Sequence, residues 1–298
     1  MRTKKGISEM AKMDYVTPGF TKIDFEDNFF VTTELDKFKN LEVKEYIESL
    51  GGVIKNSVAK TTNYLIYGDG KEETTKYKKA LELAQEGTEI KILPLSLFYV
   101  LRKGKEIIEF GAYPFKSNNK SIPIKWMVLK RENNKALLLS AYSIDVKPYN
   151  SRAKATVTWE TCTLRKWLNE DFYDKAFSEE EKKRICLTDI DNSDDQANQT
   201  TNGNYTEDKV FLLSVLEAKT LLTETIQRQM VWTPFARRKY NTLSLISERW
   251  WLRSRGDYTF SAKGVTGYGK ICDIDYDVYN GGYGVCPALW IDLKSETE

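Results

Sequence analysis

The sequence predicts an α/β domain built on a parallel sheet, followed by a second domain of the α+β class. Between residues 24 and 104, short apolar runs alternate with amphipathic segments, an order typical of parallel strands joined by helices. Beyond residue 107 the sequence carries a hairpin signal, longer amphipathic segments and an aromatic, glycine-rich end. The 298 residues suffice for two domains. Residues 102–105 form a charged boundary, and residues 1–23 are expected to be a weakly ordered basic leader.

In the first domain, four apolar runs alternate with three helical segments. We expect the four strands, which are short enough to be buried parallel strands, at residues 29–31, 53–54, 64–67 and 90–92. The first helix ends at the pair Gly51 and Gly52, because glycine is favoured just past a helix C-terminus. Its apolar face is expected to consist of Leu41, Val43, Ile47 and Leu50. The second helix covers residues 76–85, and the third opens at Pro94.

Five pieces of this domain stand in a recurring order: FVTTEL, LGG, SVAKTTNYLIYG, TTKYKKA and LPLSLF. Together they resemble the BRCT domain, the repeat named after the C-terminus of the breast-cancer protein, over about residues 24–103. The resemblance implies a four-stranded parallel sheet with three helices, and a DNA-damage or DNA-repair context. Phe98 stands where the last helix of the family usually carries a tryptophan, so we expect an aromatic ring in the core there.

The resemblance also implies that Thr32, Thr33 and Lys76 share one corner of the domain. A hydroxyl, a backbone N–H and an ammonium would there bind one phosphate, from phosphoserine, phosphothreonine or a DNA 5′-phosphate. The family usually has glycine in place of Thr33, whose Cβ is expected to crowd the phosphate. In the alternative, Thr32 satisfies local backbone and Lys76 is a solvated helix residue. Many BRCT repeats bind proteins without a phosphate.

The composition limits the function classes. The chain has 45 basic and 43 acidic residues, so it lacks the basic excess of a protein that neutralises many nucleic-acid phosphates. It has no histidine, which removes the commonest general base and the usual zinc ligand. No apolar segment approaches the ~20 residues that span a bilayer. We expect a soluble cytoplasmic protein with reduced thiols, no cofactor, no metal and no membrane association.

The second domain is expected to contain both strands and helices. The expected strands are residues 107–115, 123–130, 135–144 and 210–213, the middle two joined by a turn at residues 132–134. The expected helices are residues 159–176, a short helix capped by Ser178, another capped by Ser214, and residues 233–240. Residues 189–208 are polar and acidic and are expected to form a loop. The last sixty residues are expected to be strands and turns.

Several motifs of this second part resemble a widespread bacterial domain of unknown function, over about residues 107–293. They are FGxYP at 110–114, PIKWxVL at 123–129, TWETCTLRKWL at 158–168, VFLLS at 210–214, WWLRS at 250–254 and GVCPALWI at 284–291. The family usually has an arginine in place of Cys286. The closing pattern is also distantly similar to the C-type-lectin-like fold, which includes the formylglycine-generating enzymes.

A candidate second surface consists of Trp250, Arg253 and Arg255, because alternating aromatics and arginines stack on bases or sugars. In the alternative, this stretch is a core strand with a buried tryptophan and arginines paired to carboxylates. The oxygen-rich residues 189–195 fail the EF-hand pattern, because Asp194 stands where glycine is required.

These features predict a non-enzymatic adaptor protein. Its first domain would recognise a protein partner, with phosphoserine or phosphothreonine as the candidate ligand group, and its second domain would supply another recognition surface. One alternative is a DNA-associated module that binds a 5′-phosphorylated end or nick. Another is an enzyme or carbohydrate-binding activity in the second domain.

Overall fold

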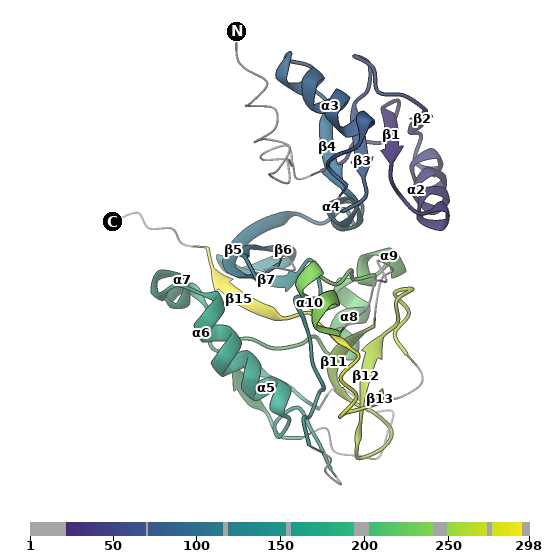
Figure 1. Ribbon diagram of the computed structural model, residues 1–298. Coiled ribbons are helices and arrows are strands. Elements are labelled where there is room, and N and C mark those ends of the chain that lie inside the picture. Colours follow the sequence, from purple (N-terminus) through teal and green to yellow (C-terminus); the bar gives the residue numbers. More distant parts are fainter. Residues whose placement is uncertain are drawn as a thin grey trace. The chain divides into compact units, whose positions relative to one another are not determined.

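The computed structural model describes residues 22–69, 71–115, 119–152, 156–193, 203–240, 249–272 and 276–293. The chain forms two compact units, residues 1–104 and residues 105–298 (Figure 1). Each unit contains its own buried apolar residues. Most of the expected leader lies outside the described residues, but Ile23 at its end is buried. Among the helices of the described ranges, none is both long enough and apolar enough to cross a membrane.

The first unit is a parallel sheet with the strand order β2-β1-β3-β4. Its strands are β1 (Phe29–Thr33), β2 (Val53–Lys55), β3 (Tyr64–Tyr67) and β4 (Lys91–Pro94). Its helices are α2 (Lys37–Ser49), α3 (Thr75–Gln85) and α4 (Leu95–Leu101). The expected four-stranded parallel sheet with helices is therefore confirmed, in the expected order along the chain.

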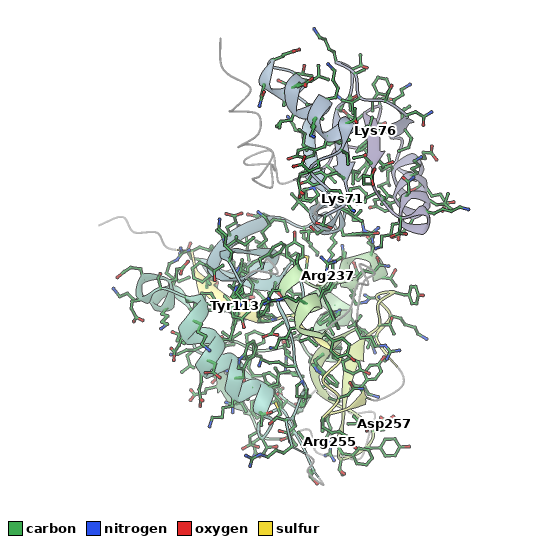
Figure 2. The ribbon with its side chains drawn as sticks, viewed as in Figure 1. Lys71, Lys76, Tyr113, Arg237, Arg255 and Asp257 are labelled. Atoms are coloured by element: carbon green, nitrogen blue, oxygen red, sulfur yellow. The ribbon has the colours of Figure 1, made fainter. Side chains whose placement is uncertain are left out.

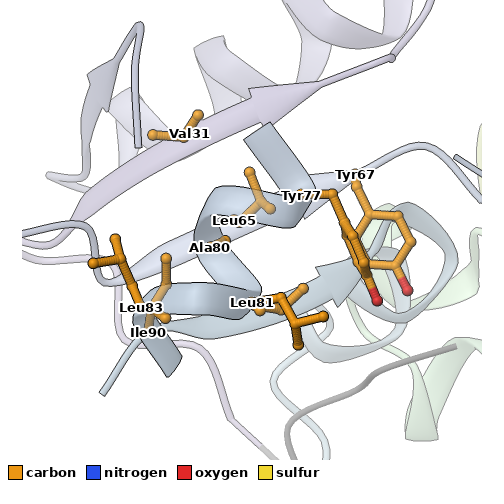
Figure 3. Packing of buried hydrophobic residues seen from close by; sticks show 9 residues of the cluster. Val31, Leu65, Tyr67, Tyr77, Ala80, Leu81, Leu83 and Ile90 are labelled. Atoms are coloured by element: carbon orange, nitrogen blue, oxygen red, sulfur yellow. The ribbon is translucent and has the colours of Figure 1, made fainter. Parts of the chain in front are cut away.

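The sheet buries both of its faces. Phe30 and Val31 follow each other along β1, so their side chains point to opposite faces. On one face, α3 covers an apolar cluster, shown in Figure 3, that consists of Val31, Leu65, Tyr67, Tyr77, Ala80, Leu81, Leu83, Ile90 and Ile92. On the other face, Phe30 stacks on Tyr64 with 4.5 Å between the ring centroids. Phe98 is fully buried and packs edge-on against Tyr46, so the expected aromatic core position is confirmed.

Three apolar positions of the first unit are more exposed than the sequence predicts. Leu41 is 56% exposed, because two residues on a helix turn about 200°, which puts it opposite the buried Val43. Leu50 is 43% exposed, because it is the C-cap beyond the last turn of α2. Val53 is 36% exposed, because β2 is the edge strand of the sheet and not a buried central one.

The second unit is a mixed α/β domain, and its described residues form three sheets. The four-stranded sheet, in the order β15-β7-β6-β5, contains β5 (Ile107–Pro114), β6 (Ser121–Glu132), β7 (Lys135–Ser140) and β15 (Ala288–Asp292). The five-stranded sheet, in the order β13-β12-β11-β14-β8, contains β8 (Asp145–Val146), β11 (Trp250–Arg255), β12 (Ser261–Val265), β13 (Tyr276–Asp277) and β14 (Gly284–Val285). The two-stranded sheet pairs β9 (Thr188–Ile190) with β10 (Thr206–Asp208).

Short helices connect these strands. They are α5 (Thr163–Trp167), the π-helical turn η1 (Leu168–Phe172), α6 (Tyr173–Ala176), α7 (Glu179–Arg184), α8 (Val215–Leu221), α9 (Thr225–Arg228) and α10 (Pro234–Tyr240). The expected capping boxes at Ser178 and Ser214 are both formed. The turn of the β6–β7 hairpin has Asn133 and Asn134 at φ 48° and 60°, a left-handed pair that suits the twist of the two strands.

Three expectations for the second unit are wrong in part. Residues 210–213 are buried, but they form one isolated bridge, from Phe211 to Ala288, and no strand. Residues 189–208 are not a loop throughout, because β9 and β10 pair at their two ends, while residues 194–202 lie outside the described residues. The helix expected over 159–176 begins only at Thr163, and the buried indole of Trp159 donates to Asp208 instead.

Candidate functional site

Thr32, Thr33 and Lys76 lie where the end of β1 meets the start of α3. Parallel strands place their carboxyl ends at one edge of a sheet, and β1 pairs with β3, the strand that leads into α3. The Nζ atom of Lys76 donates a hydrogen bond of 3.2 Å to the backbone oxygen of Thr32 (Lys76 is labelled in Figure 2). The structure therefore brings a strand end and a helix start together, as the sequence predicts.

An open pocket of about 340 Å³ lies at this corner, within the range of small-ligand sites. Its lining is polar apart from one leucine, and it consists of Thr32, Thr33, Glu34, Leu35, Asn40, Thr74, Thr75 and Lys76. We call it the Thr32 pocket. All three residues expected at the corner line it, and no apolar plug separates Lys76 from Thr32.

Local structure holds the lining in place. Thr32 and Thr33 are both buried as the last residues of β1. Thr74 is the N-cap of α3, and its side chain accepts a hydrogen bond from the backbone N–H of Tyr77. The hydroxyl of Thr32 donates to Oδ1 of Asn40 in α2 at 2.7 Å. The pocket is thus built from the end of one strand and the first turns of two helices.

The electrostatics of the pocket favour an anion, with one opposing charge. The early residues of α2 and α3 line it, and helix N-termini carry partial positive charge and N–H groups without intrahelical partners. Lys76 adds a full positive charge. Glu34 is exposed at the same lining and opposes the binding of an anion.

The chain around Glu34 needs a glycine nearby. Glu34 has φ 55°, the left-handed region that non-glycine residues rarely adopt. A Cβ atom at Gly68 would lie 2.4 Å from the backbone oxygen of Glu34. Gly68 therefore lets the segment after β3 pass close to the segment after β1, which keeps the two sides of the corner together.

The candidate second surface is a buried strand. Trp250, Arg253 and Arg255 belong to β11, which has neighbours on both sides in the five-stranded sheet, and all three are buried (Arg255 is labelled in Figure 2). The indole of Trp250 donates to the backbone oxygen of Arg228, and Arg253 forms an ion pair with Glu217. The surface prediction is therefore wrong, and the alternative of a core strand describes this stretch.

Two residues of the Thr32 pocket were not anticipated from the sequence. Asn40 and Glu34 line it, but Asn40 stands outside the quoted motifs, and Glu34, although it belongs to FVTTEL, was not expected at the site. Asn40 sits in the helix that follows β1, and only its bond to Thr32 reveals a role. Its one local signal is a polar side chain four positions after the N-cap Asp36.

In the ranges that the structure covers, no group of three or more histidine, cysteine, aspartate or glutamate side chains is placed to hold a metal ion. The four cysteines are free thiols. Cys162 is buried, and burial raises the pKa of its thiol to about 12. A thiol with this pKa is a poor nucleophile at neutral pH.

Comparison with known families assigns both units. The BRCA1 C Terminus (BRCT) domain family matches residues 25–84, and the family of the domain of unknown function DUF6273 matches residues 133–293. Both resemblances in the sequence are thereby confirmed. No solved structure matches the chain, so the similarity to the C-type-lectin-like fold stays a prediction.

Among curated proteins, the chain is similar to bacterial DNA ligases in their BRCT regions. The DNA ligase of Clostridium novyi (strain NT) is 38% identical over 85 residues, which are 26% of this chain and 12% of the ligase. The DNA ligase of Acholeplasma laidlawii (strain PG-8A) is 41% identical over 81 residues, 27% of this chain and 12% of that ligase. The DNA ligase of Thermosipho africanus (strain TCF52B) is 46% identical over 55 residues, 18% of this chain and 8% of that ligase. The chain thus matches 12% or less of the length of these relatives.

Proposed function

Because the chain belongs to the DUF6273 family and carries a BRCT domain ahead of that domain, we propose that it is a non-enzymatic adaptor that binds a phosphorylated protein. The phosphate of a phosphoserine or phosphothreonine occupies the Thr32 pocket. The observation that carries this proposal is the 3.2 Å hydrogen bond from Lys76 Nζ to the backbone oxygen of Thr32. It fixes a cation beside a strand end and two helix starts.

The chemistry of the pocket suits a dianion. Lys76 supplies a charge-assisted hydrogen bond, which is worth about 1.5–3 kcal/mol when the geometry is good. The N-terminal turns of α2 and α3 add N–H donors and a favourable dipole, and the hydroxyl of Thr32 lies at the same lining. These contacts bind the phosphate itself. The rim of the pocket contacts the residues beside the phosphate in the partner.

The charge of the first unit favours a protein over a nucleic acid. Residues 22–104 contain 13 lysine and arginine residues and 14 aspartate and glutamate residues, a net charge of −1. A domain that follows a DNA backbone gains affinity from each phosphate that it neutralises, and so carries a basic excess. A single phosphate on a peptide needs only the local charge of Lys76.

The alternative function is capture of a DNA end with a 5′-phosphate. The similarity to DNA ligases favours it, since the BRCT regions of those proteins are the ones matched. An end offers one terminal phosphate, which the Thr32 pocket accommodates without a basic stripe. Both functions place a phosphate in the Thr32 pocket. They differ in whether a peptide or a DNA end surrounds that phosphate.

The experiment compares four ligands on the full chain. A degenerate library of phosphoserine and phosphothreonine peptides is set against its unphosphorylated counterpart, and a duplex with a recessed 5′-phosphate is set against one with a 5′-hydroxyl. Retention of the phosphorylated peptides alone supports the adaptor. Retention of the 5′-phosphate duplex alone, with an affinity that falls as salt rises, supports the alternative. Equal binding of phosphorylated and unphosphorylated peptides contradicts a role for the phosphate.

A further inference from the structure

The Thr32 pocket holds a hydroxyl whose proton already points at a protein acceptor. Oγ1 of Thr32 donates to Oδ1 of Asn40 at 2.7 Å. A hydroxyl has one proton to donate, and a phosphate dianion offers only acceptors. Thr32 therefore cannot donate a hydrogen bond to the phosphate while it donates one to Asn40. In this orientation the lone pairs of its hydroxyl oxygen would face the phosphate, as a second acceptor.

We propose that Asn40 is a positioning residue, whose side-chain amide turns over when a phosphate enters the Thr32 pocket. This inference rests on the proposed function. A rotation of 180° about the last torsion exchanges the amide oxygen with the amide nitrogen at nearly the same position. The nitrogen then donates to Oγ1 of Thr32, and the hydroxyl proton is released toward the phosphate. The bond between the two residues is kept, with its direction reversed.

The geometry around Asn40 allows this change at low cost. Both side chains line the pocket, and Asn40 is half-buried, so its amide is not locked into a packed core. Its backbone is fixed, because its N–H donates to the backbone oxygen of Asp36 at 2.8 Å in the first turn of α2. Only the terminal torsion has to move, and for asparagine this torsion is broad and roughly two-fold.

Aspartate at position 40 would break the mechanism and keep the fold. A carboxylate has nearly the shape of the amide and accepts the Thr32 proton equally well, but it cannot donate in return. The N40D variant should therefore hold Thr32 permanently as a donor to the protein. Alanine at this position removes the competing acceptor and leaves the hydroxyl free to turn to the phosphate.

The test measures the binding of N-acetyl-phosphoserine N-methylamide to the full, isotopically labelled chain by amide chemical shifts. We expect N40D to weaken binding about tenfold, the value of one hydrogen bond to a charged group. Its melting temperature should match that of the unaltered chain. N40A should weaken binding less than N40D does. A purely structural role for Asn40 predicts the reverse order, because N40D keeps the Thr32 bond and N40A loses it.

A double-mutant cycle separates the hydroxyl from the added negative charge of N40D. T32V removes the hydroxyl, and if Asn40 acts through that hydroxyl, T32V/N40D binds no more weakly than the weaker single variant. Losses that multiply in the double variant show that N40D acts through its charge alone, and this overturns the inference. Unaltered affinity in N40D, with binding weakened in K76A, overturns the inference while the proposed function stands. If the unaltered chain does not bind the probe, both the inference and the proposed function are contradicted.

Discussion

The ammonium of Lys76 lies 3.2 Å from the backbone oxygen of Thr32, although the two residues are 44 positions apart in the sequence. A carbonyl oxygen is a neutral acceptor, so this bond orients the ammonium without cancelling its charge. Lysine has three N–H donors, and one bond to a carbonyl engages one of them. The contact therefore prepares a cation at the mouth of the Thr32 pocket, and it makes Lys76 the first residue to alter.

Replacing Lys76 with alanine should weaken the binding of a phosphorylated ligand by about ten- to a hundredfold, the value of a charge-assisted hydrogen bond. The affinity for an unphosphorylated partner should not change. Both affinities are measured by titrating the full chain with a peptide that it retained from the library, in its phosphorylated and its unphosphorylated form.

The matched control is Lys79→Ala in the same helix. Lys79 is exposed and pairs with Glu82 at 3.7 Å, on a part of α3 that does not line the pocket. It has the same charge as Lys76 and differs only in position. An equal loss in both variants would show that the ligand responds to the general charge of α3 and not to the pocket.

Replacing Glu34 with glutamine should strengthen the binding of a phosphorylated ligand. Glu34 is an exposed acid in the lining, and it repels a phosphate there. Because exposed charges interact weakly, the gain should be no more than about fivefold at low ionic strength. It should shrink as salt is added. Affinity measured at low and high salt checks this, and a salt-independent gain would mean that Glu34 acts by shape instead of charge.

The order of elements in the first unit is predictable because each is marked locally. Short apolar runs become strands, and glycine, threonine and proline mark the ends of helices, as Gly51, Thr74 and Pro94 do. The corner of Thr32 and Lys76 follows once the family resemblance supplies the topology. These features depend on neighbours in sequence or on a known arrangement of strands.

The features that could not be predicted depend on partners far along the chain. The run at residues 210–213 is apolar because it is buried, but a strand also needs a neighbouring backbone in register, and one bridge is all it forms. The alternation of aromatic residues and arginines in β11 fits a base-stacking surface and a core strand equally well. Only the position of Glu217 in α8 shows that Arg253 is neutralised inside the domain. The only local signal at Asn40 is its place in the first turn of α2, which does not mark a site, since its role depends on one hydroxyl across the pocket.

Replacing Glu217 with alanine should lower the free energy of unfolding by about 3 kcal/mol or more, because it leaves a buried guanidinium without its carboxylate. Arg253 is 4% exposed and meets both oxygens of Glu217, one of them at 3.2 Å. Glu217 also completes the capping box of α8. Urea unfolding of the full chain, followed by tryptophan fluorescence, measures the change.

Glu180→Ala provides the comparison for that variant. Glu180 pairs with Lys183 at 2.8 Å, and both side chains are about 70% exposed. An exposed pair contributes little, so the loss should stay below about 1 kcal/mol. Similar losses in the two variants would mean that the Arg253–Glu217 pair is solvated like a surface pair, contrary to its burial.

Replacing Cys162 with serine should remove one source of instability at alkaline pH. The folded chain raises the pKa of the Cys162 thiol from 9.0 to about 12, because burial disfavours the thiolate. Between these values the unfolded chain loses the proton and the folded chain keeps it. The contribution of this group to stability is therefore complete below pH 9 and falls by about 1.4 kcal/mol per pH unit up to about pH 12. Serine keeps an acceptor for the N-cap bond to Arg165 and does not titrate in this range.

The measured quantity is the difference in unfolding free energy between the unaltered chain and Cys162→Ser, at about pH 8 and about pH 10. Subtraction cancels the titration of every group that the two chains share. From about pH 8 to about pH 10, the serine variant should gain about 1.4 kcal/mol of unfolding free energy relative to the unaltered chain. A difference that stays constant would mean that the thiol ionises as easily in the folded chain as in the unfolded one. The helix start at Cys162 would then be open to water, and the buried network around Trp159 and Asp208 would have to be loosened as well.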